Sequence, residues 1–92
     1  YVTPAEPVTQ DALDALLADA YADEPFVHVV ADPPGVRAVR ETNHCHIHGR
    51  VDPRTGKVIV FAAIDNLWKG TSSQAVQNLN LMFGRSETEG LA

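Results

Sequence analysis

The segment KVIVFAAIDNLWKG, residues 57–70, reads as a strand that runs directly into the start of a helix. Residues 58–64 are apolar at every position. Such a run is typical of a strand covered on both faces, so we expect 57–64 to be a central strand of a sheet. Residues 65–70 then form a tight loop that presents a helix N-terminus, whose free N–H groups and positive dipole end suit a phosphate or a carboxylate.

A helix is predicted to follow this loop. Thr71 and Gln74 stand where a capping box needs them, with the Thr side chain capping the third residue and the Gln side chain reaching back. The apolar residues of this helix recur on one face, and they are Ala75, Val76, Leu79, Met82 and Phe83. Gly84 ends the helix in the preferred position, and we expect 85–92 to be a surface tail.

A hairpin is predicted on the N-terminal side of the loop. Residues 43–51 form its first strand and 57–64 its second. The connection at 52–56 contains a Pro suited to the second turn position and a Gly suited to a positive φ. Farther upstream, 26–30 has strong β composition and predicts another strand, and 36–40 is a candidate for a short extended piece.

A second helix is predicted over 10–22, with Thr9 as its N-cap and Asp11 in the first turn, where the helix dipole favours negative charge. Its apolar face carries Leu13, Leu16, Leu17, Ala20 and Tyr21. Residues 1–3 read as the stub of a strand. Together the elements predict one α+β domain over 1–92, in which two helices accompany a small sheet that is mainly antiparallel or mixed.

Composition limits the partners of this domain. Its net charge of −5 argues against a nucleic-acid or anionic membrane surface, because both attract clustered Lys and Arg. No apolar run reaches the roughly 18 residues of a membrane span, and no signal peptide is visible. The single cysteine, Cys45, excludes an internal disulfide and fits a cytoplasmic protein. The chain opens at Tyr1 without a Met and is more apolar than so few residues can hide, so we expect a fragment that meets another domain or subunit.

Three residues of the loop have ligand chemistry. Asn66 can donate and accept at once, which suits a carboxamide such as nicotinamide. Lys69 adds a point charge, and Gly70 allows the backbone to approach closely. A loop that ends in Gly before a Thr cap is also how many helices begin without a ligand, so these residues alone leave both interpretations open.

Longer motifs carry a resemblance to a known family. AIDNLWKG at 63–70 and QAVQNLNLMFG at 74–84 resemble the D-N-L-x-K-G-x-x-x-Q-A-V-Q signature of N-acetyl-gamma-glutamyl-phosphate reductases. AYADEPFV at 20–27 resembles the A-Y-x-x-E-P-F-V segment of the same family, and ETEGL at 87–91 resembles its E-T-x-G-L ending. The matches lie in family order.

This resemblance implies a two-domain enzyme of arginine biosynthesis. An upstream Rossmann domain binds NADP, and a second domain, similar to that of glyceraldehyde-3-phosphate dehydrogenase, carries catalysis and subunit contacts. A cysteine thiolate attacks the acyl phosphate and expels phosphate, and hydride from NADPH reduces the thioester to the semialdehyde, with a histidine as acid and base. The chain then is the C-terminal part of the second domain of a homo-oligomer, ending in a helix that returns to the cofactor domain.

The resemblance assigns roles to few residues here. Both catalytic residues of the family lie upstream of the stretch that this chain covers, so no catalytic residue is predicted in it. In the family the loop and the following helix lie near the nicotinamide end of the cofactor. Asn66 is therefore the first candidate for cofactor binding, followed by Lys69, Gly70 and Gln74.

Cys45 and three histidines invite other chemistry. Adjacent strand residues point to opposite faces, so His44 and His46 cannot hydrogen-bond the thiol, and we interpret Cys45 as a small core residue. His44, His46 and His48 share a face and could hold zinc, nickel or copper. No Cys, Asp or Glu at ligand spacing completes such a site, so we favour a polar surface that faces solvent or an interface. The family usually has Asp at position 46 and Gly at position 48, so the chain departs from the resemblance here.

Two further residues receive structural interpretations. Trp68 is expected to pack at a domain interface, and His28, in an apolar strand, is expected to be structural. Two functions compete with the reductase. One is a stand-alone metal-binding module built on His44, His46 and His48, and the other is an assembly module that only makes subunit contacts.

Overall fold

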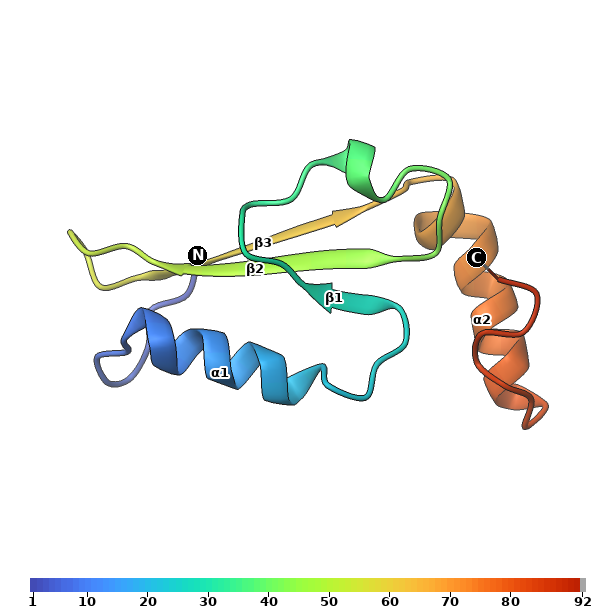
Figure 1. Cartoon of the computed structure of the whole chain (residues 1–92), viewed down its shortest axis with the longest axis horizontal. Helices are drawn as coiled ribbons and strands as arrows, with labels where there is room; N and C mark the ends of the chain where they lie inside the picture. The colour runs from blue at the N-terminus through green and yellow to red at the C-terminus, as the bar shows by residue number, and fades with distance from the viewer. Residues whose placement is uncertain (92) are drawn as a thin grey trace.

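The computed structural model describes residues 1–91, which form two α-helices and a three-stranded mixed sheet (Figure 1). The regular elements, in chain order, are α1 (Gln10–Ala20), β1 (Val27–Val29), β2 (Cys45–Val51), β3 (Val58–Ile64) and α2 (Ser73–Met82). A 3₁₀ turn, η1 (Val36–Ala38), separates β1 from β2, and a π-helical turn, η2 (Trp68–Ser72), leads into α2. The α+β prediction is confirmed, and the sheet is the mixed alternative.

The sheet has the order β1-β2-β3, with β1 parallel to β2 and β2 antiparallel to β3. The predicted hairpin is confirmed, and Gly56 in its connection has a φ of 72°. The prediction that 57–64 is the central strand is wrong, because β2 is central and β3 lies at the edge. An apolar run indicates that the two faces of a strand are covered, but it does not indicate which strands pair with its edges. The faces of β3 are themselves only partly covered, since Val60 and Ile64 remain 45% and 40% exposed.

The free edge of β3 receives one partner from the start of the chain. Val2 and Val58 exchange two backbone hydrogen bonds, of 2.7 and 2.8 Å, as an isolated antiparallel bridge. The expectation that residues 1–3 are the stub of a strand is therefore confirmed at Val2. The pairing covers only one end of β3, and the rest of this edge carries no strand among residues 1–91.

Helix α1 covers one face of β2. Thr9 caps it as predicted, with its Oγ1 accepting from the Ala12 amide at 3.1 Å. The helix lies so close to β2 that a Cβ atom at Gly49 would stand 2.6 Å from the Leu17 side chain and 3.1 Å from Leu13. Leu13 is buried in this contact. Gly49 is thus what allows helix and strand to pack closely.

The connection from β1 to β2 contains a helical turn at the place where the sequence predicted an extended piece. The prediction for 36–40 is wrong, because Val36–Ala38 forms the 3₁₀ turn η1. The turn brings Val39 inward until its side chain is fully buried. Burial of this one side chain outweighs the weak extended preference of the segment.

Helix α2 packs on the rest of the chain through a polar face, whereas the sequence predicted an apolar packing face. Its buried residues are polar: Ser73, Gln77 and Asn80. The predicted apolar face exists but points outward, leaving exposed Val76, Leu79, Met82 and Phe83. The predicted surface tail folds back along α2 (Figure 1), where the Asn80 amide donates to the carbonyl groups of Glu87 and Glu89. The last residue of that tail, Ala92, lies outside the described residues.

No helix within residues 1–91 has the length and apolar character needed to cross a membrane.

Candidate functional site

Asp65 organises the loop between β3 and α2. Its Oδ1 atom accepts the amide N–H groups of Leu67 and Trp68, each at 2.9 Å, and its Oδ2 atom accepts the amide N–H of Glu41 at 2.8 Å. These three N–H groups depress the pKa of the Asp65 carboxyl, with the Glu41 contact first, and the positive charge of Arg40 adds to the effect. Asp65 therefore stays ionised and occupies the donors of the first helical turn.

The predicted capping box is wrong, because Asp65 and not Thr71 accepts the N–H groups at the start of the helical path. The helical path begins at Trp68, so Thr71 lies inside η2, where its hydroxyl donates to the Asn66 carbonyl at 2.8 Å. The Gln74 amide donates to the Asn78 side chain at 2.8 Å instead of reaching back. The Asp that directly follows the apolar strand was the sequence signal for this turn, because Asp side chains readily accept from backbone N–H groups two and three residues on.

Lys69 points into a polar network. Its Nζ atom donates to Gln77 Oε1 at 2.6 Å and lies 5.5 Å from the centre of the Phe26 ring. The Gln77 Oε1 atom also accepts from the buried Asn43, and its Nε2 donates to Glu87. Burial lowers the pKa of Lys69, against the opposing influence of Cys45 and Glu87. The network ties η2, α2 and the C-terminal tail together, and sequence reasoning missed both Asn43 and Gln77.

Asn66 and Gly70 remain available to a ligand. The Asn66 side chain is exposed, and within residues 1–91 no hydrogen bond engages its amide. A Cβ atom at Gly70 would lie 3.4 Å from Asn66 Oδ1 and 3.4 Å from the Asp65 carbonyl, so Gly70 keeps space beside that amide. Of the four predicted cofactor residues, Asn66 and Gly70 are adjacent, whereas Lys69 and Gln74 bond to α2 side chains.

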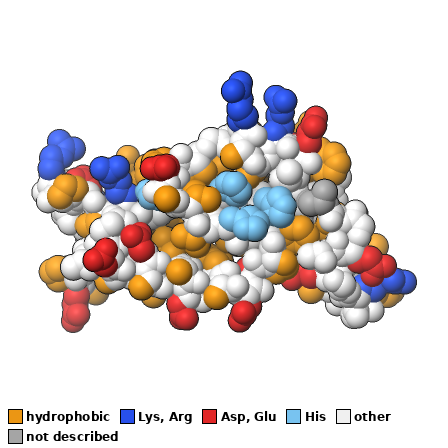
Figure 2. All heavy atoms as spheres, in the orientation of Figure 1, with side chains coloured by type: hydrophobic (Ala, Val, Ile, Leu, Met, Phe, Trp, Pro, Cys, Tyr) orange, Lys and Arg blue, Asp and Glu red, His pale blue; other side chains and the backbone are white. Residues whose placement is uncertain are grey.

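The histidines gather differently from the predicted row. Parallel pairing sets His28 opposite His46, and the Nε2 atom of His28 lies 2.9 Å from His44 Nδ1. The His28 ring centre lies 4.7 Å from that of His44 and 5.6 Å from that of His46. Figure 2 shows these pale-blue side chains together on the exposed surface. We call His28, His44 and His46 the histidine cluster. The side chain of His28 is exposed, and its interpretation as a structural residue stays a prediction.

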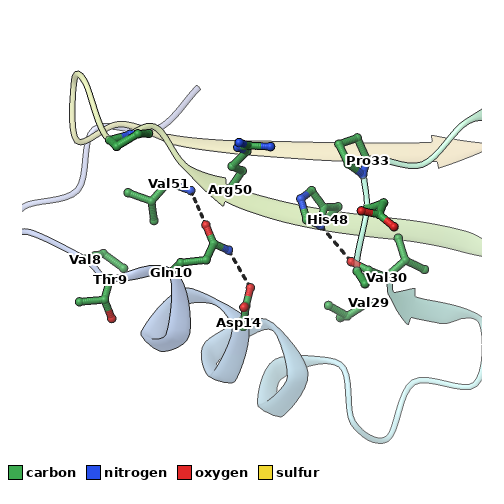
Figure 3. Close-up of a pocket in the computed structure, with 13 residues that line it drawn as sticks. Val8, Thr9, Gln10, Asp14, Val29, Val30, Pro33, His48, Arg50 and Val51 are labelled. Carbon is green, nitrogen blue, oxygen red and sulfur yellow. Dashed lines mark hydrogen bonds between the residues drawn. The ribbon is translucent and has the colours of Figure 1, made fainter.

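His48 stands apart from that cluster. Its Nδ1 atom lies 2.9 Å from the Val30 carbonyl, and its ring borders an open groove of about 790 Å³ between α1, β2 and the segment after β1 (Figure 3). On the other side of this groove, Gln10 bonds Asp14, the Gly49 carbonyl and the Val51 amide. The row of His44, His46 and His48 is therefore not one site.

Neither metal binding nor thiol catalysis gains support from the geometry. In the part of the chain that the structure describes, no three His, Cys, Asp or Glu side chains are placed to hold one metal ion. Cys45 is partly buried, and burial raises the pKa of its thiol, although Lys69 opposes this. A nucleophilic cysteine needs the opposite shift, because the thiolate is the reactive form.

Comparison with known proteins places the domain. Residues 1–66 match the family described as "Semialdehyde dehydrogenase, dimerisation domain". The chain is 56% identical over 95 aligned residues to an N-acetyl-gamma-glutamyl-phosphate reductase of Desulforudis audaxviator (strain MP104C), covering 99% of this chain and 27% of the relative. It is 49% identical over 94 residues to the reductase of the same name from Pelobacter propionicus (strain DSM 2379 / NBRC 103807 / OttBd1), covering 100% of this chain and 27% of the relative.

A third relative shows the same pattern over a shorter stretch. The N-acetyl-gamma-glutamyl-phosphate reductase of Ruegeria pomeroyi (strain ATCC 700808 / DSM 15171 / DSS-3) is 57% identical over 77 residues, or 82% of this chain and 22% of the relative. The chain thus spans about a quarter of the length of such reductases and is homologous to their C-terminal region. The match over 1–66 includes α1, all three strands and the start of the loop, and the chain belongs to the semialdehyde dehydrogenase dimerisation-domain family.

Proposed function

We propose that this chain is the C-terminal part of a longer cytoplasmic reductase that uses NADPH to convert N-acetyl-glutamyl phosphate to the semialdehyde in arginine biosynthesis. The observation that carries the proposal is near-complete coverage of the chain, at about half identity, by reductases of that name. The relatives are about four times as long. The remaining length has room for a nucleotide-binding domain and the catalytic cysteine and histidine.

The outward apolar face of α2 supports contact with that upstream domain. Leu79, Met82 and Phe83 are 51%, 78% and 71% exposed, and Trp68 and Leu67, which precede α2, are 42% and 72% exposed. A soluble protein rarely leaves so many large apolar side chains of neighbouring segments in water. We expect α2 to lie against the cofactor domain, with Trp68 packed at the interface. The sheet, in turn, makes contacts with a second copy in a homo-oligomer.

The loop fits one end of the cofactor better than the other. NADPH supplies a hydride to the acyl group when bound. The exposed Asn66 amide can donate to and accept from the nicotinamide carboxamide at once, and Gly70 leaves room for that group. The phosphates are poorly matched here, because Asp65 already takes the Leu67 and Trp68 N–H groups and Lys69 donates to Gln77.

The four candidate residues therefore separate into two roles. Asn66 binds and orients the nicotinamide. Gly70, which has no side chain, leaves the space that the nicotinamide carboxamide occupies. Lys69 acts by holding η2 against Phe26 and Gln77, and Gln74 acts by fixing Asn78 on α2. In this proposal the reacting acyl phosphate meets no side chain of this chain that could act as nucleophile or base.

Steady-state kinetics of the intact protein test this assignment. Asn66→Ala is expected to raise the KM for NADPH about two- to tenfold, which corresponds to the loss of hydrogen bonds worth about 0.5–1.5 kcal/mol. Asp23→Ala, at an exposed position in the turn after α1, serves as the control and is expected to leave that KM unchanged. An unchanged KM in Asn66→Ala would favour the competing assembly module, in which the domain makes only subunit contacts.

A further inference from the structure

The histidine cluster adds side-chain contacts between two strands that pair over only three residues. His28 belongs to β1, His46 is its register partner on β2, and His44 directly precedes β2. β1 is only three residues long and lies at the edge of the sheet. Its flanks are held by two backbone bonds, from the Cys45 amide to the Phe26 carbonyl and from the Val30 amide to the Ile47 carbonyl, each 2.8 Å. The imidazoles add side-chain contacts between the strands, beside the bond of His48 to the Val30 carbonyl.

The contact between His28 and His44 depends on protonation. At 2.9 Å, one ring nitrogen must carry a hydrogen and the other must present a lone pair. If both rings are protonated, two N–H groups face each other and two positive charges lie in contact. The hydrogen bond is then replaced by repulsion, so the arrangement disfavours protonation of both rings at once.

The surroundings supply no negative charge to offset a proton. The groups that face His44 are His28 from β1, His46 from β2 and Lys69 from η2, with the Phe26 ring 5.7 Å away. Within residues 1–91 the ion pairs are Arg54 with Asp52 and Arg85 with Glu89, so no carboxylate pairs with the cluster. Burial, followed by His28, His46 and Lys69, lowers the pKa of His44 below its ordinary value of 6.5.

We propose that the histidine cluster is a proton-sensitive contact that holds β1 on β2 at neutral pH and releases it in mild acid. A lowered folded-state pKa means that the unfolded or released form binds the proton more tightly. The stabilisation is therefore complete above pH 6.5 and is lost as the pH falls through the folded-state value of His44. Phe26, which directly precedes β1, carries the Lys69 contact, so release of β1 also loosens the loop at 65–70.

Hydrogen exchange of the intact protein, read by mass spectrometry, tests the proposal. Between about pH 7.5 and about pH 5.5, protection of segment 26–30 is expected to fall several-fold after correction for intrinsic exchange, while β3 keeps its protection. His44→Phe retains a ring at the position but cannot take a proton, and it is expected to remove this pH dependence. His48→Phe is the matched control, since His48 bonds Val30 outside the cluster, and it is expected to keep it.

A second measurement guards against a variant that does not fold. In the wild-type protein labelled with ¹³C-histidine, the titration midpoint of the His44 ring is expected to lie below that of free histidine. This midpoint should coincide with the pH at which protection of 26–30 is lost. Constant protection across the range overturns the proposal. So does an equal pH dependence in folded His44→Phe, because the titrating group then lies elsewhere.

Discussion

Asp65 and Glu41 are joined by one hydrogen bond, in which the Glu41 amide donates to Asp65 Oδ2 at 2.8 Å across 24 positions of sequence. Glu41 is the non-glycine residue with a positive φ, 59°, among residues 1–91. The other oxygen of Asp65 caps the helical turn that follows β3. One carboxylate thus starts the helix and holds the strained turn before β2, which places the candidate loop relative to the sheet.

Loss of the Asp65 carboxylate is expected to destabilise the fold. Asp65→Ala leaves the amides of Glu41, Leu67 and Trp68 without their acceptor, so we expect the melting temperature to fall by several degrees. Asp23→Asn, in an exposed loop, is the control and should change it little. A melting temperature for Asp65→Ala equal to that of the control would contradict the capping role.

The same carboxylate predicts an acid sensitivity. Its pKa lies below the ordinary 3.8 in the folded state, so the unfolded chain binds the proton more tightly. The stabilisation from Asp65 is present above that ordinary value and is lost as the pH falls through the folded-state value. Denaturation curves measured over this acid range should show a shallower pH dependence for Asp65→Asn than for the wild type, and parallel curves would argue against the prediction.

Glycine at position 41 is expected to stabilise the protein. A left-handed backbone costs a side-chain-bearing residue about 1–2 kcal/mol, and glycine removes this cost. Glycine also makes the unfolded chain more flexible, which cancels about half of the stabilisation. Glu41→Gly should therefore raise the free energy of unfolding by about 0.5–1 kcal/mol. Gly56→Ala, at a φ of 72° with open space around it, is the reverse experiment and should lower it by about 1 kcal/mol. Urea denaturation measures both, and a loss in Glu41→Gly as large as in Gly56→Ala would refute the account.

Gly49 is expected to be sensitive to an added side chain. Gly49→Ala places a methyl group 2.6 Å from Leu17, so we expect the free energy of unfolding to drop by about 1–3 kcal/mol. Gly35→Ala is the matched control, because nothing lies within 4 Å and its φ is −111°. That change should be stabilising by about 0.4–1 kcal/mol. Equal effects at the two glycines would mean that α1 does not pack on β2 as described.

The apolar face of α2 predicts an effect that depends on the rest of the protein. Leu79→Gln should leave the stability of the 92-residue chain almost unchanged, since Leu79 is already half exposed there. In the intact protein we expect a loss of about 1–2 kcal/mol, because the side chain is then buried against the upstream domain. Thermal denaturation of both forms makes the comparison. A similar small effect in both would show that another surface meets that domain.

Local patterns in the sequence located most of the elements. The 3.6-residue spacing of Leu13 and Leu17 set α1, and the β-rich segments around Val27 and Val60 marked strands, because such periodicities depend only on neighbouring residues. The motif at 63–70 also located the loop with Asn66. These features are written in contiguous stretches of chain.

The sequence-based predictions were wrong where contacts between residues far apart in the chain determine the structure. Thr71 looked like a cap, but the bond that Asp65 makes to Glu41 and the π-helical start at Trp68 shift the helix by several residues. The position of β3 at the edge is set by which strands pair, which an apolar run does not encode. His28 joins His46 only through parallel register, a non-local choice. Sequence reasoning therefore found the candidate residues but not the contacts that organise them.

The most direct test of the account is the reductase assay, run in the reverse direction because the acyl phosphate is labile. NADP reduction is followed with N-acetylglutamate semialdehyde and phosphate, using the intact protein and the 92-residue chain side by side. We expect turnover by the intact protein that requires both substrates, and none by the chain alone. Turnover by the chain alone, or an intact protein without activity, would contradict it.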